Sequence, residues 1–535
     1  MNATTTEVTN FTESDVDPAV HARRWWVLAV LCMSMLVIVM DNTILNVAIP
    51  KLITDLNASN SQVQWIIDSY TIVFAGLLLT AGSLGDRFGR KKALIAGLVL
   101  FGAFSAMASQ AGSAPMLIVA RGLMGIGGAF IFPTTLSILT NSFAGRERAR
   151  AIGIWAGVAG LGIVIGPLAG GLLLEHFAWG SVFLVNVPVC ATAVVLAYFF
   201  VPDSHDPEEG RLDPVGALLS IVALTLLLYG IIEAPNLGWT DAKVVAALAG
   251  GAAVLALFLG WELHSDHPML DVRFFKNPRF SAASGTITLT FFALFGSTFL
   301  LTQYFQFVLG YSPLEAGLMT APVAVGIMGL APQAPKFVDR FGTKRVVVAG
   351  LLIVAGALCF YASDTVMSSL VGGALVRLMF GAGMGLTTAP ATESIMGSLP
   401  PGKAGVGSAV NDTTRQTGGA LGVAVLGSIF ALRYHAIIGE AEFAPAALRP
   451  EVKDSIGKAL AAAASAGGTV GQRIVAEARH AFVVSMRLVY ATSALVVLCA
   501  AFVAWSFLPA RAPAEPAVLF DEEVELSEAL SVTDT

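Results

Sequence analysis

The sequence predicts an all-α membrane protein with fourteen transmembrane helices: two six-helix halves and two helices inserted between them. Three observations carry this prediction. Of the 535 residues, 56% are hydrophobic and only 13% are charged, whereas soluble domains carry about 25% charged residues. Fourteen apolar segments are long enough to cross a bilayer. Two pairs of motifs also recur along the chain at nearly one offset.

The apolar segments are counted by their length. A spanning helix needs about 20 mainly apolar residues, because each residue adds about 1.5 Å along the helix axis. The segments that meet this requirement are 26–49, 62–83, 93–111, 116–140, 149–172, 179–201, 212–233, 242–263, 281–309, 315–336, 344–362, 367–392, 404–431 and 481–508.

Basic residues in the connecting loops orient the spans. The strings "DRFGRKK", "GRERAR", "DVRFFKNPR" and "DRFGTKR" all fall on the side of the membrane where the N-terminus lies. Because basic loops stay in the cytoplasm, we expect a multi-pass protein of the cell membrane with both termini cytoplasmic. The segment 432–480 falls outside despite six Lys and Arg residues, since long loops obey this rule poorly. It is predicted as a helical hairpin on the outer surface.

An internal repeat indicates two equivalent halves. "DRFGRKK" begins at Asp86 and "DRFGTKR" begins at Asp339, 253 residues later; Arg121 and Arg377 each open Arg-x-x-x-Gly-x-Gly and lie 256 residues apart. Spans 1–6 therefore correspond to spans 9–14, and spans 7 and 8 are an insertion. Such parallel halves are the plan of a large secondary-transporter fold that binds its substrate near the bilayer midplane.

This repeat divides the chain into five parts. Much of the acidity of the chain lies outside the apolar segments, in the N-terminal tail and in the ending "DEEVELSEALSVTDT". The predicted parts are an N-terminal cytoplasmic tail 1–24, an N-terminal half 25–203, an inserted helix pair 204–265, a C-terminal half 266–510 with the outer loop 432–480, and an acidic cytoplasmic tail 511–535.

Three charged residues interrupt the first four spans: Asp41, Asp68 and Arg121. A charge at the bilayer centre costs about 2.5 to 3.5 kcal/mol on insertion scales, so such residues mark functional sites by default. All three lie roughly 8 to 12 Å below the outer boundary, and we expect them to share a proton-coupling site. An Asp beside an Arg is poised to exchange a proton when the Arg moves. The alternative is a static pair that only holds helices together.

Span 13 carries a second charged pair. Asp412 and Arg415 lie about 12 to 16 Å from the cytoplasmic boundary and share one helix face, three residues apart. We predict Asp412 as a further proton-coupling acid, with Arg415 and Gln416 facing the substrate. The alternative is a local ion pair between residues i and i+3. Glu393 lies near the inner end of span 12, where it reaches water.

The short loop after span 2 is predicted to act as a gate. Its string "GSLGDRFGRKK" combines glycines that let helix ends approach with an Asp and several cations. Charge pairs and helix-end dipoles can hold the cytoplasmic ends together and then release them. The gating residues are Gly82, Gly85, Asp86, Arg87, Gly89 and Arg90, with Asp339 and Arg340 in the second copy.

Span 5 carries a glycine face. Gly162, Gly166 and Gly170 recur at four-residue spacing, which allows close contact with another helix. Pro167 removes a backbone donor and bends the helix. The string therefore predicts a tight, bent helix–helix interface.

Together these strings resemble one family. "LGDRFGRKK" is similar to the loop signature of the major facilitator superfamily, "RGLMGIGGA" to its span-4 arginine motif, and "GIVIGPLAGG" to its antiporter motif. "MDNTILNVAIP" and "WIIDSYTIVFAG" look like the span-1 and span-2 signatures of its fourteen-span drug/proton antiporters. The similarity extends from Arg24 to about Leu508.

The resemblance implies a major facilitator fold and export of lipophilic, often cationic drugs, driven by protons that move inward. It makes Asp41 the span-1 acid, Asp68 the span-2 acid and Arg121 the span-4 arginine of proton coupling. Relatives that export divalent cations carry several acids in span 13, whereas this chain has only Asp412 there. This departure argues against broad specificity for dications.

Aromatic side chains are candidates for the substrate cavity. Trp65 and Tyr70 flank Asp68, and Phe295 lies on one face of span 9. Such rings can stack on a cationic drug, and the alternative is packing against lipid or neighbouring helices. The predicted cavity set is Asp68, Trp65, Tyr70, Phe295, Arg415 and Gln416.

Other function classes lack support in the sequence. No nucleophile or metal-binding pattern indicates an enzyme, so we predict no catalytic residue, no metal and no cofactor besides the proton gradient. A net charge of −6 is not that of a nucleic-acid-binding protein. The expected partners are small-molecule drugs, lipophilic cations, protons and membrane lipid, and the expected state is a monomer. An exporter of one specific metabolite or antibiotic is the alternative function.

Overall fold

Helices follow the apolar segments of the sequence. The computed structural model describes residues 18–143, 145–204, 213–265, 268, 270, 272–362, 370–399 and 404–510, and these ranges contain helices and no strand. Each predicted span is helical over most of its described residues. The boundaries differ because several helices continue beyond the apolar part, such as α1, which begins at Pro18 and ends at Asp55.

The first half and the inserted pair consist of nine helices within the described residues, and α6 and α7 together form the sixth span. Their bounds are α1 Pro18–Asp55, α2 Asn60–Phe88, α3 Arg90–Ser109, α4 Ala114–Ser142, α5 Gly145–His176, α6 Ser181–Leu184, α7 Asn186–Phe200, α8 Pro214–Leu237 and α9 Ala242–His264.

The second half adds the remaining helices, several of them short. Their bounds are the 3₁₀ helix η2 Val272–Lys276, α10 Pro278–Gln303, the π-helix η3 Tyr304–Val308, α11 Pro313–Leu330, η4 Ala331–Gln333, α12 Ala334–Phe341, α13 Thr343–Tyr361, α15 Leu370–Met396, α16 Ala404–Ile438, η6 Ala446–Leu448, α17 Arg449–Asp454, α18 Ile456–Ala466 and α19 Gly468–Phe507.

Twelve helices in the described residues are long and apolar enough to cross a membrane. The count becomes thirteen if the two parts of α2, Asn60–Leu78 and Thr80–Phe88, are one span despite a bend of 51°. In α5 the apolar part is the shorter helix Gly160–His176. The chain is therefore a multi-pass membrane protein.

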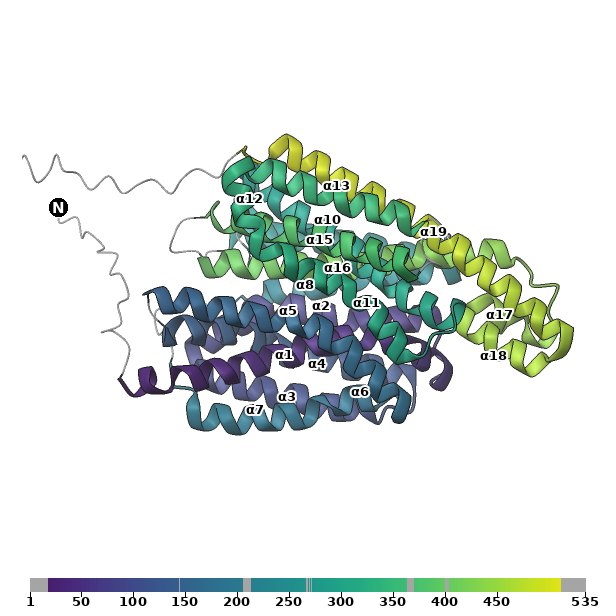
Figure 1. The fold of residues 1–535 in the computed structure, drawn as a ribbon, viewed down its shortest axis with the longest axis horizontal. Coiled ribbons are helices and arrows are strands. Elements are labelled where there is room, and N and C mark those ends of the chain that lie inside the picture. Colours follow the sequence, from purple (N-terminus) through teal and green to yellow (C-terminus); the bar gives the residue numbers. More distant parts are fainter. Residues whose placement is uncertain are drawn as a thin grey trace, which may run out of the picture.

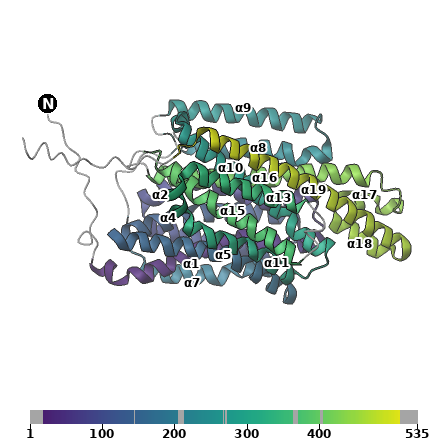
Figure 2. The same ribbon diagram turned by 45° about the horizontal axis from the view of Figure 1, so that its top comes forward.

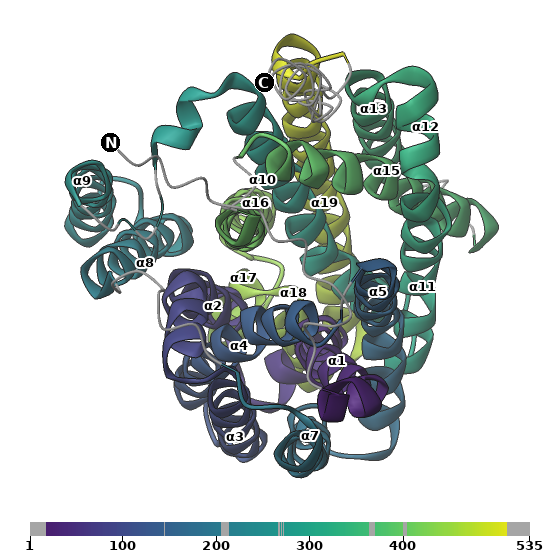
Figure 3. The ribbon, with the colours of Figure 1, turned by 90° about the vertical axis from the view of Figure 1, so that its left-hand side faces the viewer.

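The helices form two groups with the inserted pair at one side. Figure 3 looks along the bundle and shows α1 to α5 and α7 in one group and α10 to α16 and α19 in the other, with α8 and α9 beside them. Of these two, α8 contacts α2 in one half and α16 in the other. The two halves also meet where α5 packs on α11 and where α1 packs on α10.

Two hydrogen bonds join the halves near the end of α1. The hydroxyl of Thr302 donates to the carbonyl oxygen of Asn46 at 2.7 Å, and Nε2 of Gln306 donates to the carbonyl oxygen of Val47 at 3.0 Å. Helix α18 packs on the same region, since an added Cβ at Gly457 would lie 2.6 Å from Ile53 of α1 and 3.0 Å from Phe307 of η3. Helices α17 and α18 lie at one end of the bundle (Figure 1). The start of α1 and the end of α19 both lie at the opposite end (Figure 2).

Candidate functional site

A buried ion pair forms the centre of the N-terminal half. Nη1 of Arg121 lies 2.5 Å from Oδ2 of Asp41, and the exposed fractions of the two side chains are 1% and 0%. Nε of Arg121 donates to the carbonyl oxygen of Ile66, and its guanidinium lies 4.4 Å from the centre of the Tyr70 ring. Helices α1, α2 and α4 are thus joined through one arginine.

The other oxygen of Asp41 has a partner from α7. Nδ2 of Asn186 donates to Oδ1 of Asp41 at 2.8 Å and to the hydroxyl of Ser105 at 3.1 Å. The hydroxyl of Ser105 in turn donates to the carbonyl oxygen of Phe183. Asn186 was not predicted as a site residue, and the signal for it is one amide within the apolar string "VFLVNVPVC".

Asp68 lies at the same level but takes no part in this network. Its neighbours along α2, Ile66 and Ser69, are both hydrogen-bonded to α4, at Arg121 and Ile118 respectively. The Asp68 side chain is fully buried, and neither carboxylate oxygen has a hydrogen-bond partner among the described residues. The three charges predicted to share one site are therefore a pair plus a separate acid.

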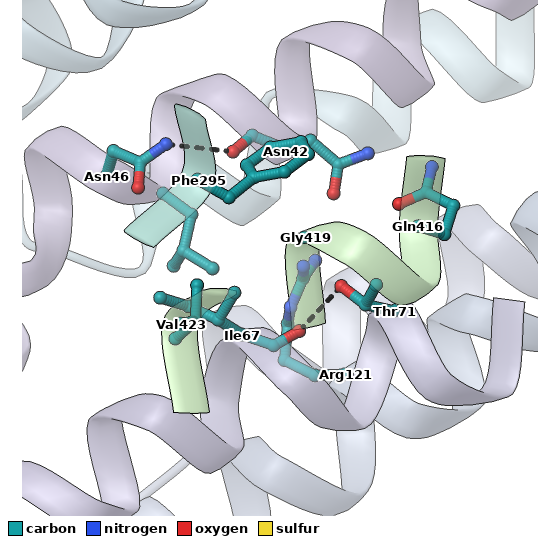
Figure 4. A pocket seen from close by; sticks show the side chains of 10 residues that line it. Asn42, Asn46, Ile67, Thr71, Arg121, Phe295, Gln416, Gly419 and Val423 are labelled. Atoms are coloured by element: carbon teal, nitrogen blue, oxygen red, sulfur yellow. Dashed lines mark hydrogen bonds between the residues drawn. The ribbon is translucent and has the colours of Figure 1, made fainter. Parts of the chain in front are cut away.

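A pocket lies between the two halves beside this pair. It is lined by residues of α1, α2 and α4 from the first half and of α10 and α16 from the second (Figure 4). Its open space is about 20 Å³, roughly the room that one water molecule needs. A site for a drug-sized ligand needs at least about 300 Å³, so this pocket is too small for such a ligand in this conformation. The lining residues are Asn42, Leu45, Asn46, Ile67, Thr71, Arg121, Phe295, Gln416, Gly419 and Val423.

Two of the predicted cavity residues, Phe295 and Gln416, line this pocket, and the other four do not. Trp65 instead packs against Tyr229 of α8, with ring centres 6.4 Å apart. Tyr70 stacks on the guanidinium of Arg121, and Arg415 donates to the hydroxyl of Thr392. Asp68 lies on α2 between the lining residues Ile67 and Thr71 but does not itself line the pocket.

Three polar lining residues were not predicted: Asn42, Asn46 and Thr71. Asn42 directly follows Asp41, and Asn46 lies one helical turn later, so both amides share a face of α1. Nδ2 of Asn42 donates to the carbonyl oxygen of Ile38 at 3.1 Å. The spacing of four residues between the two amides is the signal that identifies this face.

Asp412 and Arg415 form the local pair considered above as an alternative. Nη1 of Arg415 lies 3.8 Å from Oδ1 of Asp412. The Arg415 side chain is 30% exposed and the Asp412 side chain is 13% exposed. The guanidinium also lies 5.3 Å from the centre of the Phe291 ring. The pair is thus held on α16 and tied to α15 through Thr392.

The first gating loop is held within its own half. Asp86 pairs with Arg90 and accepts a hydrogen bond of 2.8 Å from the hydroxyl of Ser137 on α4. Gly89 has a φ of 114°, in the region that only glycine adopts readily, so the chain turns there into α3. Gly85 faces α4 closely, since an added Cβ would lie 2.7 Å from the Thr134 methyl.

The rest of this loop and its second copy are more open. Arg87 lies 5.5 Å from the centre of the Phe88 ring, and Gly82 faces Pro133 on α4. In the second copy Asp339 and Arg340 are exposed, and no described acid or base pairs with either. Within the described residues, the charge pairs of the gating loops therefore do not join the two halves.

The glycine face of α5 packs directly on α1 beside Asp41. An added Cβ at Gly162 would lie 2.9 Å from Val39, and one at Gly166 would lie 3.0 Å from the carbonyl oxygen of Met40. Gly170 faces Ile44 in the same way. On the other side of α5, Gly317 of α11 approaches the carbonyl oxygen of Pro167. Helix α5 is thus packed between α1 of its own half and α11 of the other half.

A protein-family model matches the sequence over most of its length. The model described as Major Facilitator Superfamily matches residues 31–423. The chain belongs to the major facilitator superfamily. Because this superfamily consists of transporters, the chain is a transporter and not an enzyme.

Several relatives within the superfamily are resistance or export proteins. The chain is 37% identical to the multidrug efflux pump LfrA of Mycolicibacterium smegmatis over 490 residues, which cover 90% of this chain and 95% of that protein. It is 34% identical to the methyl viologen resistance protein SmvA of Salmonella typhimurium over 493 residues, covering 90% and 98%. It is 32% identical to the tetracenomycin C resistance and export protein of Streptomyces glaucescens over 494 residues, covering 90% and 91%.

Solved structures agree with the fold. The bacterial homolog to the human lysosomal transporter Spinster, in an inward-facing and unoccupied conformation, superposes with a TM-score of 0.67 at 18% identity, covering 94% of this chain and all of that one. The xylose transporter XylE from E. coli superposes with a TM-score of 0.58 at 14% identity, covering 91% and 98%. The chain therefore has the all-helical major facilitator fold.

Proposed function

We propose that this protein is a proton-coupled antiporter that exports lipophilic, often cationic drugs across the cytoplasmic membrane by alternating access, and so confers multidrug resistance. One observation carries the proposal: Arg121 lines the pocket between the halves and is also the partner of the buried Asp41. The same side chain therefore faces both the substrate and the proton-carrying acid. The relatives named as efflux and resistance proteins support the export of drugs.

Electrostatics explain how a proton and a cation would exchange. While Asp41 is ionised, it neutralises Arg121, so the pocket lining carries no net charge. A proton on Asp41 leaves the guanidinium uncompensated beside the pocket. At about 5 Å and an effective dielectric constant near 20, that charge repels a bound cation by about 3 kcal/mol, more than a hundredfold in affinity. Proton binding and cation binding are then mutually exclusive, as antiport requires.

We propose further roles for the two other acids. Asp68 is buried without a hydrogen-bond partner among the described residues, and an unpaired buried charge is costly, so a proton or a substrate cation compensates it. Asp412, paired with Arg415 on the opposite half, is the second proton-coupling acid. Protons supply the energy and no cofactor takes part.

We propose fourteen spans with both termini in the cytoplasm. Helices α2 and α5 join the twelve others, since each has more than 20 residues, long enough to cross the bilayer. Residues 25–203 and 266–510 then form the moving halves and 204–265 the inserted pair, in a monomer surrounded by lipid. The segment 432–480 lies outside the cell.

Export of one specific compound is the second candidate. The relative named as a tetracenomycin C resistance and export protein aligns over 90% of this chain, so a self-made antibiotic is a possible cargo for the same fold. Drug susceptibility of a pump-deficient host across a panel of cations, dyes and antibiotics tests both. Resistance to many cations supports the broad pump, and resistance to one compound supports the specific one. No change for any compound overturns both.

A further inference from the structure

The C-terminal half contains a second buried arginine. Arg377 of α15 is 2% exposed and lies roughly 10 Å along the helix from its first described residue, Leu370. Its guanidinium lies 5.1 Å from the centre of the Phe305 ring, and Nη2 contacts the sulfur of Met319 at 3.6 Å. Arg377 does not line the pocket between the halves.

The internal repeat aligns Arg377 with Arg121, yet the two surroundings differ. Arg121 pairs with Asp41 of α1. The corresponding stretch of α10, from Leu294 to Ser297, contains no acid. No described carboxylate forms an ion pair with Arg377. The guanidinium is charged at every physiological pH. Among the described residues, the C-terminal half therefore buries an arginine without an acidic partner, whereas the buried arginine of the N-terminal half is neutralised by Asp41.

Hydrogen-bond donors gather around this cation. Tyr361 of α13 and Tyr490 of α19 are buried, with ring centres 5.2 Å apart. The Tyr361 ring centre also lies 6.1 Å from that of Phe380, three residues after Arg377 on α15. The hydroxyls of Tyr361 and Tyr490 and Nε of Arg377 have no hydrogen-bond partner among the described residues. Buried polar groups almost always have partners, so three unused donors in one cluster indicate a ligand that accepts hydrogen bonds.

We propose that Arg377, Tyr361 and Tyr490 bind a small monovalent anion, such as chloride, inside the C-terminal half. An anion neutralises the guanidinium and accepts from both hydroxyls, whereas water accepts hydrogen bonds and leaves the charge uncompensated. The positive edges of aromatic rings also favour an anion. The burial of all three side chains excludes a lipid headgroup or a large organic anion. The inference is independent of which drugs the protein exports.

Chloride-dependent stability of the purified full-length protein tests this site. The melting temperature is measured in detergent at constant ionic strength while sodium chloride replaces sodium gluconate, whose anion is too large to enter. A ligand that binds only the folded state raises the melting temperature with its concentration. We expect such a rise, and we expect Tyr361→Phe with Tyr490→Phe to raise the half-saturating chloride concentration at least tenfold. Tyr198→Phe, at an exposed position, is the control.

Arg377→Gln separates anion binding from packing. It removes both the charge and its need for a counter-ion, so we expect it to lower the melting temperature more in chloride than in gluconate. Equal melting of the wild type in both salts overturns the proposal, as does a chloride effect that persists in Arg377→Gln. Asp364 lies outside the described residues. If chloride raises the melting temperature of Asp364→Asn but not of the wild type, Asp364 is the counter-ion of Arg377, and this result also overturns the proposal.

Discussion

Asn186 donates a hydrogen bond of 2.8 Å to Oδ1 of Asp41, whereas Arg121 pairs with Oδ2. The carboxylate is therefore held by a cation from α4 on one side and an amide from α7 on the other. Both partners fix its position, and neither lies near it in the sequence.

The first prediction concerns this amide. Asn186→Ala removes one donor from a fully buried carboxylate, and hydrogen bonds to charged groups contribute about 1.5 to 3 kcal/mol. We expect at least a tenfold slower exchange of drug for protons in proteoliposomes, with normal amounts of protein. Thr192→Ala on the same helix, whose hydroxyl bonds only within α7, should leave the rate unchanged. Equal rates for Asn186→Ala and wild type would show that the amide has no part in coupling.

The second prediction concerns Asp41 itself. Asp41→Asn cannot release a proton, so we expect no drug efflux against a gradient, measured as dye extrusion from cells. It also leaves Arg121 buried without a counter-ion, which costs about 3 to 5 kcal/mol. Adding Arg121→Gln should therefore recover stability without recovering transport, and Asp55→Asn at the exposed end of α1 should change neither. Efflux against a gradient by Asp41→Asn would refute the coupling role.

The sequence predicts the depth of these charges in the membrane but not the direction in which each side chain points from its helix. Depth follows from 1.5 Å per residue, and it correctly put Asp41 and Arg121 together. Asp68 is at the same level, yet successive residues of a helix differ by about 100° in direction. Ile66 and Ser69 face α4, so Asp68 points away from it. The direction depends on packing between helices, which one sequence does not reveal.

The internal repeat likewise predicts the grouping of the helices better than the partners of individual side chains. It predicted two equivalent halves, and the helices do form two groups. It also aligned Arg377 with Arg121, although among the described residues Arg121 has an acidic partner and Arg377 has none. The signal for Asn186 is weak, because one amide in an apolar span resembles many structural amides. Neutral partners of a buried charge become visible only when the helices are in place.

Asp68 gives the third prediction. Its carboxylate has no cationic partner among the described residues and lies one helical turn before Thr71, which lines the pocket. It is thus available to the second charge of a divalent cation. We expect Asp68→Asn to reduce resistance to divalent cations more than to monovalent ones, measured as inhibitory concentrations in a pump-deficient host. Equal losses for both groups would argue against a selective role.

The fourth prediction concerns the interface of α1 and α5. In Gly166→Ala the new methyl would collide with Thr43 and with the carbonyl oxygen of Met40, and overpacking costs about 1 to 3 kcal/mol. We expect a lower melting temperature and a loss of efflux. Gly157→Ala on the same helix meets no atom within 4 Å and should be neutral or slightly stabilising, because Ala favours helix over Gly. Similar effects of the two substitutions would exclude close packing as the cause.

The last prediction concerns the bonds that join the halves near the end of α1. Thr302→Val with Gln306→Leu removes both donors to the carbonyls of Asn46 and Val47. Two bonds of about 0.5 to 1.5 kcal/mol each correspond to a shift of roughly 5- to 150-fold towards the conformation in which these ends separate.

Labelling of a cysteine at position 46 measures this shift. Asn46→Cys keeps the accepting carbonyl and places a thiol in the pocket lining, and the four native cysteines are first replaced. We expect a membrane-impermeant thiol reagent, added outside the cell, to react faster in the double variant. Thr298→Ala is the control, because that hydroxyl bonds only to Leu294 within α10. If the double variant and the control react at the same rate, the two bonds do not hold this end closed.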